Sequence, residues 1–555
     1  MSEKIFIGVA WPYANGPLHL GHIAGAYLPA DIFARYHRAK GNEVLMVSGS
    51  DQHGTPITIK AEQEGKKPAE VAAFYHRSFL DSWSKLGISF DLFTSTSTAN
   101  HAEVTRDIFL KLLERGYIYK DTTSQAFCPQ CRRFLPDRYV EGTCPYCASP
   151  RARGDQCDQC GKPMNTAELI NPHCRVCGST PEFRETEHFF LRLSSFSDCL
   201  SAWAEKQSQW RPNVFMLTQR YLKEGLRDRA ITRDIDWGVP VPVAGFENKR
   251  IYVWFEAVIG YLSATREWAK SGGDDERWRS FWQHDEAKSY YFIGKDNIPF
   301  HTLIWPAMLM GYGDLNLPYD IPANEFLTIE GRKLSTSQNW AVWLPDYLSR
   351  YDPDPLRYLL SINMPETSDT DFSWREFIRR NNDELVATYG NLVNRVLTLT
   401  YRNFDGCVPA PAELDSSSRA LLDKAIDTPR SVDALLSRCS FREAIRTAMS
   451  LAHDANRYLD QKSPWKIIKE DRQAAADSLY VALCAISCLK TVLYPFLPFS
   501  SQKVHEYLGF EGKVEDYGWQ PTVPEPGQKL RESKPLFTKL DGAVAEAETS
   551  RLGKV

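Results

Sequence analysis

Four C-x-x-C pairs that lie close together constrain the fold of this chain more than any other feature of its sequence. Four thiolates form a closed tetrahedral zinc site, so eight cysteines paired in this way predict two structural zinc ions. A secreted disulfide scaffold would be short and rich in cysteine throughout, whereas this chain has 555 residues and 13 cysteines. We therefore expect zinc knuckles in a reducing compartment. The four pairs are Cys128/Cys131, Cys144/Cys147, Cys157/Cys160 and Cys174/Cys177.

The composition excludes several classes of protein. With 43% apolar and 25% charged residues, the chain is neither disordered nor fibrous, and a formal net charge of -4 excludes a generally basic nucleic-acid coat. Residues 120–190 carry nine Lys/Arg and nine Asp/Glu, so we interpret the knuckles as structural. The N-terminal residues resemble neither a signal peptide nor a transit peptide, and the longest apolar stretch, 479–489, predicts a core helix. We expect a soluble, cytoplasmic protein without a membrane association.

The chain outside the cysteine block follows an α/β pattern and then a helical one. Strand patterns at 4–10 and 43–48 flank a helix pattern at 18–39, and further helices are predicted at 56–64, 69–86 and 99–115. Two more strands are predicted at 250–255 and 289–293, and the chain is helical from about residue 376. These patterns predict a Rossmann-like parallel sheet, split by a zinc-knuckle insertion and followed by an α-helical bundle.

Two short segments predict a nucleotide site. His19 and His22 stand three residues apart at a predicted helix start, where imidazoles can donate hydrogen bonds to phosphate, and Gly21 lets a flat base approach the backbone. Far along the chain, the basic loop 333–337 (KLSTS) suits charge neutralisation on a polyphosphate. Neither segment is specific alone, since helix starts with two histidines and solvated basic loops both occur by chance.

Taken together, HLGH and KLSTS resemble the HIGH and KMSKS signatures of class I aminoacyl-tRNA synthetases. More specifically, the chain resembles methionyl-tRNA synthetases through PYANGPLHLGH, SGSDQHGTP, YVWFEAVIGY, FIGKDNIPFH and NLVNRV, from about residue 4 to about 500. The resemblance implies a catalytic domain in two halves at 1–115 and 231–325, with a connective insertion at 116–230 carrying the knuckles at about 128–177. It also implies a stem-contact region with the KLSTS loop at 326–380, and an anticodon-binding bundle with a C-terminal tail at 381–555.

The resemblance also implies a role for individual residues. His19, His22 and Lys333 would be catalytic. ATP would contact His19, Gly21, His22, Gly294, Lys295, Asp296, Lys333, Leu334, Ser335, Thr336 and Ser337. Methionine would contact Ala10, Trp11, Tyr13, Asp51, Trp254, Ala257, Tyr261 and His301, with Asp51 binding its ammonium group. The anticodon would contact Asn391, Arg395 and Trp465. The zinc pairing implied is nested, with the outer two cysteine pairs on one ion and the inner two on the other, although the loop lengths also allow sequential pairing.

Several positions depart from the family pattern. Trp11 stands where a leucine is common, Glu256 and Val258 stand where aspartate and proline are common, and Thr336 replaces the second lysine of KMSKS. Among the residues of the same loop, Lys333 is the best candidate to replace that positive charge.

The implied function is that of a methionine–tRNA ligase, which uses ATP and L-methionine to form methionyl-adenylate and pyrophosphate, and then charges tRNA(Met). Mg²⁺ is expected with ATP, two Zn²⁺ in the knuckles, and a monomer in solution. The alternatives are a sister ligase for another aliphatic amino acid, which would carry a large editing insertion, and a paralogue without aminoacylation activity, which Thr336 favours.

Overall fold

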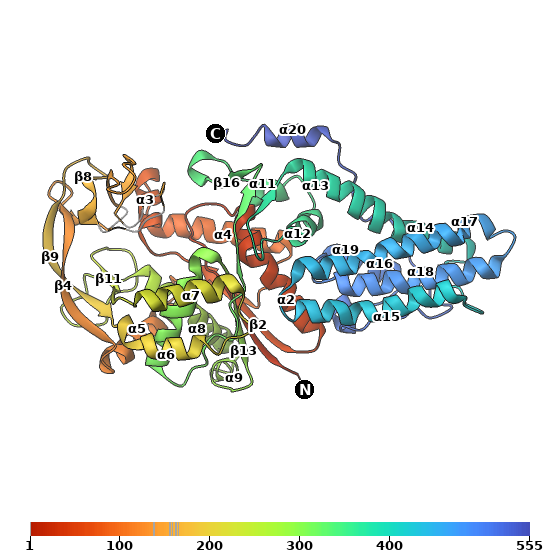
Figure 1. The fold of residues 1–555 in the computed structure, drawn as a ribbon, viewed down its shortest axis with the longest axis horizontal. Helices are drawn as coiled ribbons and strands as arrows, with labels where there is room; N and C mark the ends of the chain where they lie inside the picture. The colour runs from red at the N-terminus through yellow and green to blue at the C-terminus, as the bar shows by residue number, and fades with distance from the viewer. Residues whose placement is uncertain are drawn as a thin grey trace.

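The structure is a computed structural model that describes residues 2–136, 139–154, 157, 159–160, 164 and 166–554. The molecule is elongated, as Figure 1 shows. A cysteine-rich region forms one end, a parallel sheet with its helices forms the middle, and a helical bundle forms the other end. The predicted combination of an α/β region and a helical region is therefore confirmed.

The central sheet has five parallel strands in the order β14-β13-β1-β2-β3. The three inner strands are apolar and mostly buried because helices cover both faces of the sheet. The strand order reverses between β1 and β13, and ligands of such sheets bind outside the carboxyl ends of the strands at this point. The strands are β1 Lys4–Val9, β2 Glu43–Ser50, β3 Leu92–Ser95, β13 Lys288–Gly294 and β14 Ala323–Asn324.

The helices that follow β1, β2 and β3 agree with the predicted ranges to within two residues at each end. The first helix has a π-helical segment, η1, between its first turn and its main part. These elements are α1 Leu20–His22, η1 Ile23–Tyr27, α2 Leu28–Ala39, α3 Thr55–Glu64, α4 Pro68–Leu86 and α5 Ala99–Glu114.

One predicted strand is wrong. Residues 250–255 form a strand only in the short β12, Arg250–Ile251, and the helix α8, Val253–Ser271, begins immediately afterwards. The aromatic and β-branched residues of this stretch favour a strand by propensity. The apolar spacing that continues through Ile259 and Leu262 instead buries one helix face against β2 and α5, and this packing overrides local propensity.

The insertion is built on a long antiparallel ribbon. β4, Ile118–Cys128, pairs with β9, Glu182–Leu191, over ten residue pairs from Ile118↔Leu191 to Phe127↔Glu182. The ribbon projects from the sheet region and carries the cysteines at its far end (Figure 1). The small strands there are β5 Arg133–Phe134, β6 Val140–Thr143, β7 Ala152–Arg153 and β8 Ile170–Cys174, and the chain returns through α6 Ser197–Ala204 and α7 Pro212–Glu224.

Beyond β14 the chain forms a small sheet that carries the KLSTS loop. β15, Leu327–Ile329, and β16, Arg332–Lys333, form a hairpin whose turn residues Glu330 and Gly331 have φ of 48° and 73°. Two positive φ angles define a tight turn that matches the twist of the strands. β17, Thr370–Phe372, pairs with β15, and α11 Leu344–Leu348, α12 Pro353–Ile362 and α13 Trp374–Arg380 lead to the bundle.

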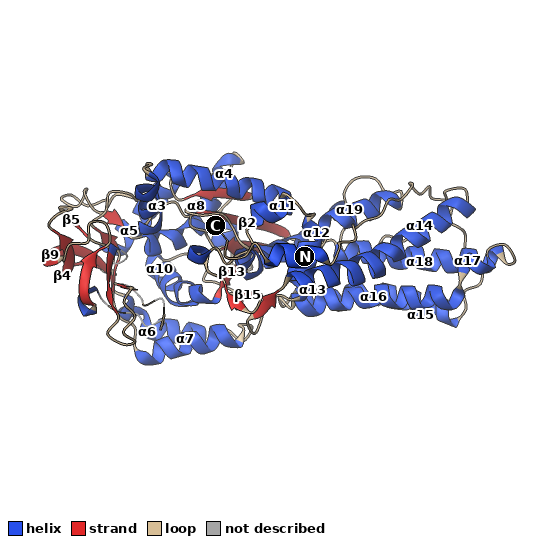
Figure 2. Cartoon of the chain, turned by 90° about the horizontal axis from the view of Figure 1, so that it is seen from above, coloured by secondary structure: helices blue, strands red, loops and turns tan. Residues whose placement is uncertain are grey.

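The bundle contains one helix, α18 Arg472–Leu493, that is long and apolar enough to cross a membrane by length and composition. Of its most apolar window, 89% is buried inside the protein, so it is the predicted core helix. The helices around it are α14 Asn391–Asn403, α15 Ser416–Leu436, α16 Phe441–Lys462, α17 Pro464–Ile467 and α19 Pro498–Tyr507 (Figure 2).

The C-terminal segment returns to the middle of the molecule. Its helix α20, Ala543–Thr549, lies beside the region of α11, α13 and β16 (Figure 1). The Gly553 N–H donates a hydrogen bond to the Asn339 carbonyl at 3.0 Å, and Arg551 pairs with Asp346 at 3.1 Å. The tail therefore contacts the segment that directly follows the KLSTS loop.

Candidate active site

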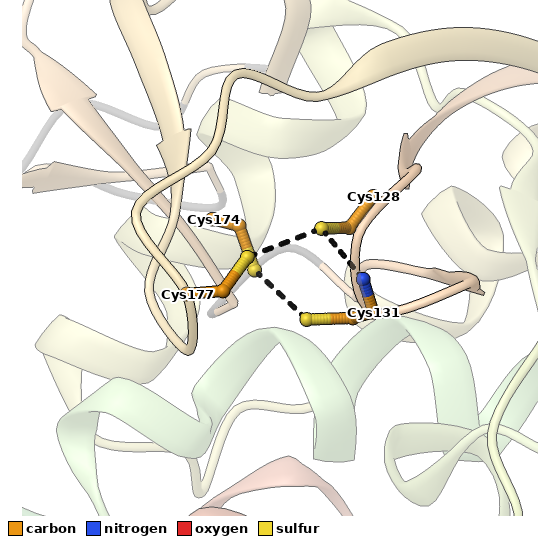
Figure 3. Close-up of side chains that lie close together, drawn as sticks. All are labelled: Cys128, Cys131, Cys174 and Cys177. Atoms are coloured by element: carbon orange, nitrogen blue, oxygen red, sulfur yellow. Dashed lines mark hydrogen bonds between the residues drawn. The ribbon is translucent and has the colours of Figure 1, made fainter.

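The eight paired cysteines form two separate groups of four. Cys128, Cys131, Cys174 and Cys177 form one group, and Cys144, Cys147, Cys157 and Cys160 form the other, with the sulfur atoms of each group within 4.8 Å of one another. In the first group the Sγ atoms of Cys128 and Cys177 are 3.4 Å apart, as Figure 3 shows. The arrangement is the nested one. Four thiolates at this spacing fit a tetrahedral zinc ion.

The HLGH segment and the KLSTS loop are in direct contact. A Cβ atom placed on Gly21 would lie 2.6 Å from Cδ1 of Leu334, so a larger residue there would require the Leu334 side chain to move. The backbone beyond the loop pairs with the HLGH segment, because the N–H of Leu20 donates to the Val342 carbonyl and that of Leu344 donates to the Leu18 carbonyl. Segments more than three hundred residues apart therefore form one edge of the site.

The two histidines stack and are both neutral. Their ring centroids are 3.7 Å apart, with planes inclined by 21°. Burial lowers the pKa of His22 to about 4, and burial together with His22 lowers the pKa of His19 well below its usual value. The backbone N–H of His19 donates to Nδ1 of His22 at 3.2 Å, which places the proton of His22 on Nε2. His22 thus keeps a ring N–H to donate.

The predicted amino-acid pocket lies at the ends of β1 and β2. Asp51 is 3% exposed, its backbone pairs with Pro12 and Ala14, and Tyr13 forms a bridge with it. Burial, and then the charge of Glu256, raises the pKa of Asp51 well above its usual value. Such a carboxylate favours a ligand that brings its own positive charge.

The other residues predicted for this pocket include aromatic side chains of α8 and of the neighbouring π-helix η6, Phe300–Ile304. His301 donates through Nδ1 to the Asn297 carbonyl at 2.9 Å, so its Nε2 accepts from the Tyr261 hydroxyl at 2.8 Å. Burial lowers the pKa of His301 to about 4 and keeps it neutral. Trp254 is 39% exposed and packs edge-on against Phe300 at a centroid distance of 5.1 Å.

Trp11 occupies a slot made by two glycines. A Cβ atom on Gly49 would lie 2.4 Å from the indole ring, and one on Gly260 would lie 2.7 Å from it. These contacts explain how a tryptophan fits where the family pattern often has a leucine. Ala10 and Ala257, the remaining residues predicted for the amino-acid pocket, are half-buried at the end of β1 and in the first turns of α8.

The predicted nucleotide residues lie at the end of β13 and on the KLSTS loop, and Lys295 belongs to a cluster of charges there. Lys295 pairs with Glu325 at 2.7 Å and with Asp369 at 2.8 Å. Gly294 has a Cβ position only 2.8 Å from Oδ1 of Asp296, so a side chain there would collide with that carboxylate. Lys333 is exposed, and no ion pair of it occurs within the described ranges. Ser335, Thr336 and Ser337 follow on the same loop, and Ser335 pairs with Trp340.

The predicted anticodon residues belong to α14 and α17 in the bundle, far from the sheet region (Figure 1), and two of them, Arg395 and Trp465, are in contact. The guanidinium of Arg395 lies over the ring of Trp465 at 4.8 Å and pairs with Asp460 at 3.2 Å. Trp465 is 36% exposed, which leaves part of its ring open to a ligand. Asn391 is exposed at the start of α14, one turn before Arg395.

Two residues of the pocket region were not predicted as site residues. Nδ1 of His53 lies 2.8 Å from Oε1 of Glu256, and both side chains are buried. His53 belongs to the polar run GSDQHGT that follows β2, and this position after a parallel strand was the signal that could have found it. Glu256 was recognised only as a departure from the family pattern.

The fold and the contact between HLGH and KLSTS define a class I aminoacyl-tRNA synthetase. The family described as "tRNA synthetases class I (M)" matches residues 5–397, and the "Anticodon binding domain of methionyl tRNA ligase" matches residues 408–554. The chain belongs to the methionyl-tRNA synthetase family.

Individual relatives agree with this assignment. The chain is 65% identical over 553 residues to a methionine–tRNA ligase of Dehalococcoides mccartyi, covering 100% of both chains. It is 53% identical over 579 residues to one of Thermomicrobium roseum, covering 100% of this chain and 99% of the relative. Among solved structures, it is similar to Mycobacterium tuberculosis methionyl-tRNA synthetase in complex with methionyl-adenylate, with a TM-score of 0.80, 26% identity, and coverage of 97% of this chain and 100% of the other.

Proposed function

We infer that this chain is a methionine–tRNA ligase, which forms methionyl-adenylate and pyrophosphate from methionine and ATP and then transfers methionine to the 3' end of tRNA(Met). The observation that carries this conclusion is the full-length identity of 65% to a methionine–tRNA ligase. The contact of Gly21 with Leu334, which unites the two signature segments, supports the same chemistry. A sister ligase with a large editing insertion is excluded, since the relatives match over their whole length.

In the first step the carboxylate of methionine attacks the α-phosphorus of ATP and pyrophosphate leaves. No covalent catalyst is needed, so the protein contributes positioning and electrostatic stabilisation. We propose that the ring N–H groups of His19 and His22 donate hydrogen bonds to phosphate oxygens. Burial lowers the pKa of both imidazoles and keeps them neutral, so neither ring needs a carboxylate of the protein to balance a positive charge. Lys333 supplies the positive charge that Thr336 lacks.

The remaining predicted residues divide between the two substrates. We propose that Gly21, Gly294, Lys295 and Asp296, with loop residues 334–337, contact ATP. Asp51 binds the ammonium group of methionine, and Tyr13, Trp254, Tyr261 and His301 surround its side chain, with Ala10, Trp11 and Ala257 completing the pocket. A polarizable thioether is favoured by such aromatic walls. The Tyr261 hydroxyl uses its proton in the hydrogen bond to His301, so its oxygen can only accept a hydrogen bond from a ligand.

Metal ions have two distinct places in this proposal. Each cysteine group would hold one Zn²⁺, which would stiffen the end of the β4–β9 ribbon. Mg²⁺ bound with ATP would neutralise charge on its phosphates and would be held mainly by the substrate.

The helical end of the molecule is the proposed site for the anticodon of tRNA(Met). A partly exposed Trp465 ring can stack on an unstacked base, while Asn391 and Arg395 reach base edges. Trp465→Ala should weaken tRNA charging by roughly 1–3 kcal/mol and leave methionine-dependent pyrophosphate exchange intact, because the bundle is remote from the sheet. Equal losses in both assays would assign Trp465 to the bundle core. We also propose a cytoplasmic monomer.

Pyrophosphate exchange with ATP, measured separately with each of the twenty amino acids, tests the proposed function. Exchange should depend on methionine, and charging should be specific for tRNA(Met). A protein that catalyses pyrophosphate exchange but does not charge tRNA(Met), or that does neither, would contradict the ligase activity. Such a result would favour the paralogue without aminoacylation activity.

A further inference from the structure

A second carboxylate is buried next to Asp51. Glu256, in the first turn of α8, is 0% exposed, and its Oε1 accepts a hydrogen bond from Nδ1 of His53 at 2.8 Å. Its other oxygen, Oε2, is buried and has no hydrogen-bond partner in the described chain. An unpartnered carboxylate oxygen that is shielded from water is costly, so it indicates a position kept for another group.

The same histidine connects both carboxylates. The backbone N–H of His53 donates to Oδ1 of Asp51 at 3.3 Å, while its ring donates to Glu256. No lysine or arginine forms an ion pair with Asp51 or Glu256 among the residues that the structure describes. Within the described ranges, the two carboxyl groups are therefore joined by His53 and not by a lysine or an arginine.

The other titratable groups packed around the first turns of α8 stay neutral. His101, on α5, has a pKa lowered to about 3 by burial and by His53, and His301, on η6, has one lowered to about 4 by burial. On β3, Thr94 donates to Glu267, which lies three turns further along α8. The polar contacts beside the pocket are thus made by the two carboxyl groups and by His53, which joins them.

We propose that the Glu256–His53 pair is a positioning unit that supports Asp51 in recognising the ammonium group of the amino acid. The ring of His53 holds Glu256 by a hydrogen bond, and the backbone N–H of the same residue holds Asp51, so both carboxyl groups are oriented by one residue beside the proposed ammonium position. This inference rests on the proposed function, because it assigns the amino acid to the pocket at Asp51.

Binding of methionine to the full-length wild type, Glu256→Gln and Glu256→Asp tests the unit. Equilibrium dissociation constants from tryptophan fluorescence, measured at one fixed pH, do not depend on catalysis. Glu256→Gln should bind methionine about tenfold more weakly than the wild type, while Glu256→Asp, which keeps the carboxylate, should bind it nearly as well as the wild type.

A ligand without the amino group separates this role from simple packing. The desamino analogue of methionine should bind the wild type and Glu256→Gln equally, whereas a collapsed pocket would weaken both ligands. Glu267→Gln, which removes a carboxylate from the same helix away from the pocket, is the control and should behave as the wild type. Equal affinity for methionine in the wild type and Glu256→Gln would overturn the inference. A wild type that binds no methionine would instead overturn the proposed function.

Discussion

At the scale of single residues, the site shows how unusual side chains are accommodated by their neighbours. Trp11 fits because Gly49 and Gly260 leave room for the indole on both sides. Gly21 has the same role for Leu334, which lets the KLSTS loop reach the HLGH segment. The residue type at one of these positions therefore limits which side chain fits at the other, because the two residues are in direct contact.

The coupling of Trp11 and Gly260 can be measured. Gly260→Ala should destabilise the protein by about 1–3 kcal/mol, because the new methyl group overlaps the indole ring. In a Trp11→Leu background the same change should cost clearly less, since leucine leaves room. Denaturant unfolding of the four proteins gives the interaction energy. Strictly additive effects would mean that the two residues do not share this slot.

At the scale of elements, much of the fold follows from local patterns. The strands around HLGH and the helices α3, α4 and α5 could be predicted, because their apolar spacing agrees with their burial. The start of α8 could not, because its residues favour a strand and only packing against β2 and α5 selects a helix. The contact of His53 with Glu256 joins residues two hundred positions apart, and no local pattern encodes it.

The assignment of the eight paired cysteines to two zinc ions can be tested by metal analysis. Metal analysis should find about two zinc ions per chain. The double variant Cys144→Ser with Cys160→Ser changes one group only, so it should keep one ion. The matched variant Cys131→Ser with Cys144→Ser changes both groups and should lose both ions. If the pairs were sequential, the first variant would lose both ions and the second variant would keep one.

At the scale of the whole molecule, a buried ion pair joins the sheet region to the bundle. Arg357, on α12, is fully buried and donates to Asp31 of α2 at 2.7 Å and to the carbonyls of Pro495 and Phe496, which follow α18. Burial by itself raises the pKa of Asp31, but Arg35 and Arg357 outweigh it and lower the pKa to about 2.

Removing this carboxylate should destabilise the whole chain. Asp31→Asn leaves a buried guanidinium without its partner and should cost about 3–5 kcal/mol in denaturant unfolding. Because the pKa of Asp31 is lower in the folded state, its stabilisation is complete above the unfolded pKa of about 4 and is lost as the pH falls toward 2. The variant should therefore lose less stability than the wild type between pH 5 and pH 3. Parallel losses would exclude Asp31 as the cause.

The account rests on one adenylation site built from two distant segments, and single-turnover formation of methionyl-adenylate tests this claim most directly. His22→Ala and Lys333→Ala should each lower the rate constant about a hundredfold or more and leave the Kd for methionine nearly unchanged, because both interactions form chiefly in the transition state. Thr336→Lys should be as fast as the wild type or faster. A wild-type rate in Lys333→Ala, or no methionyl-adenylate from the wild type, would contradict the account.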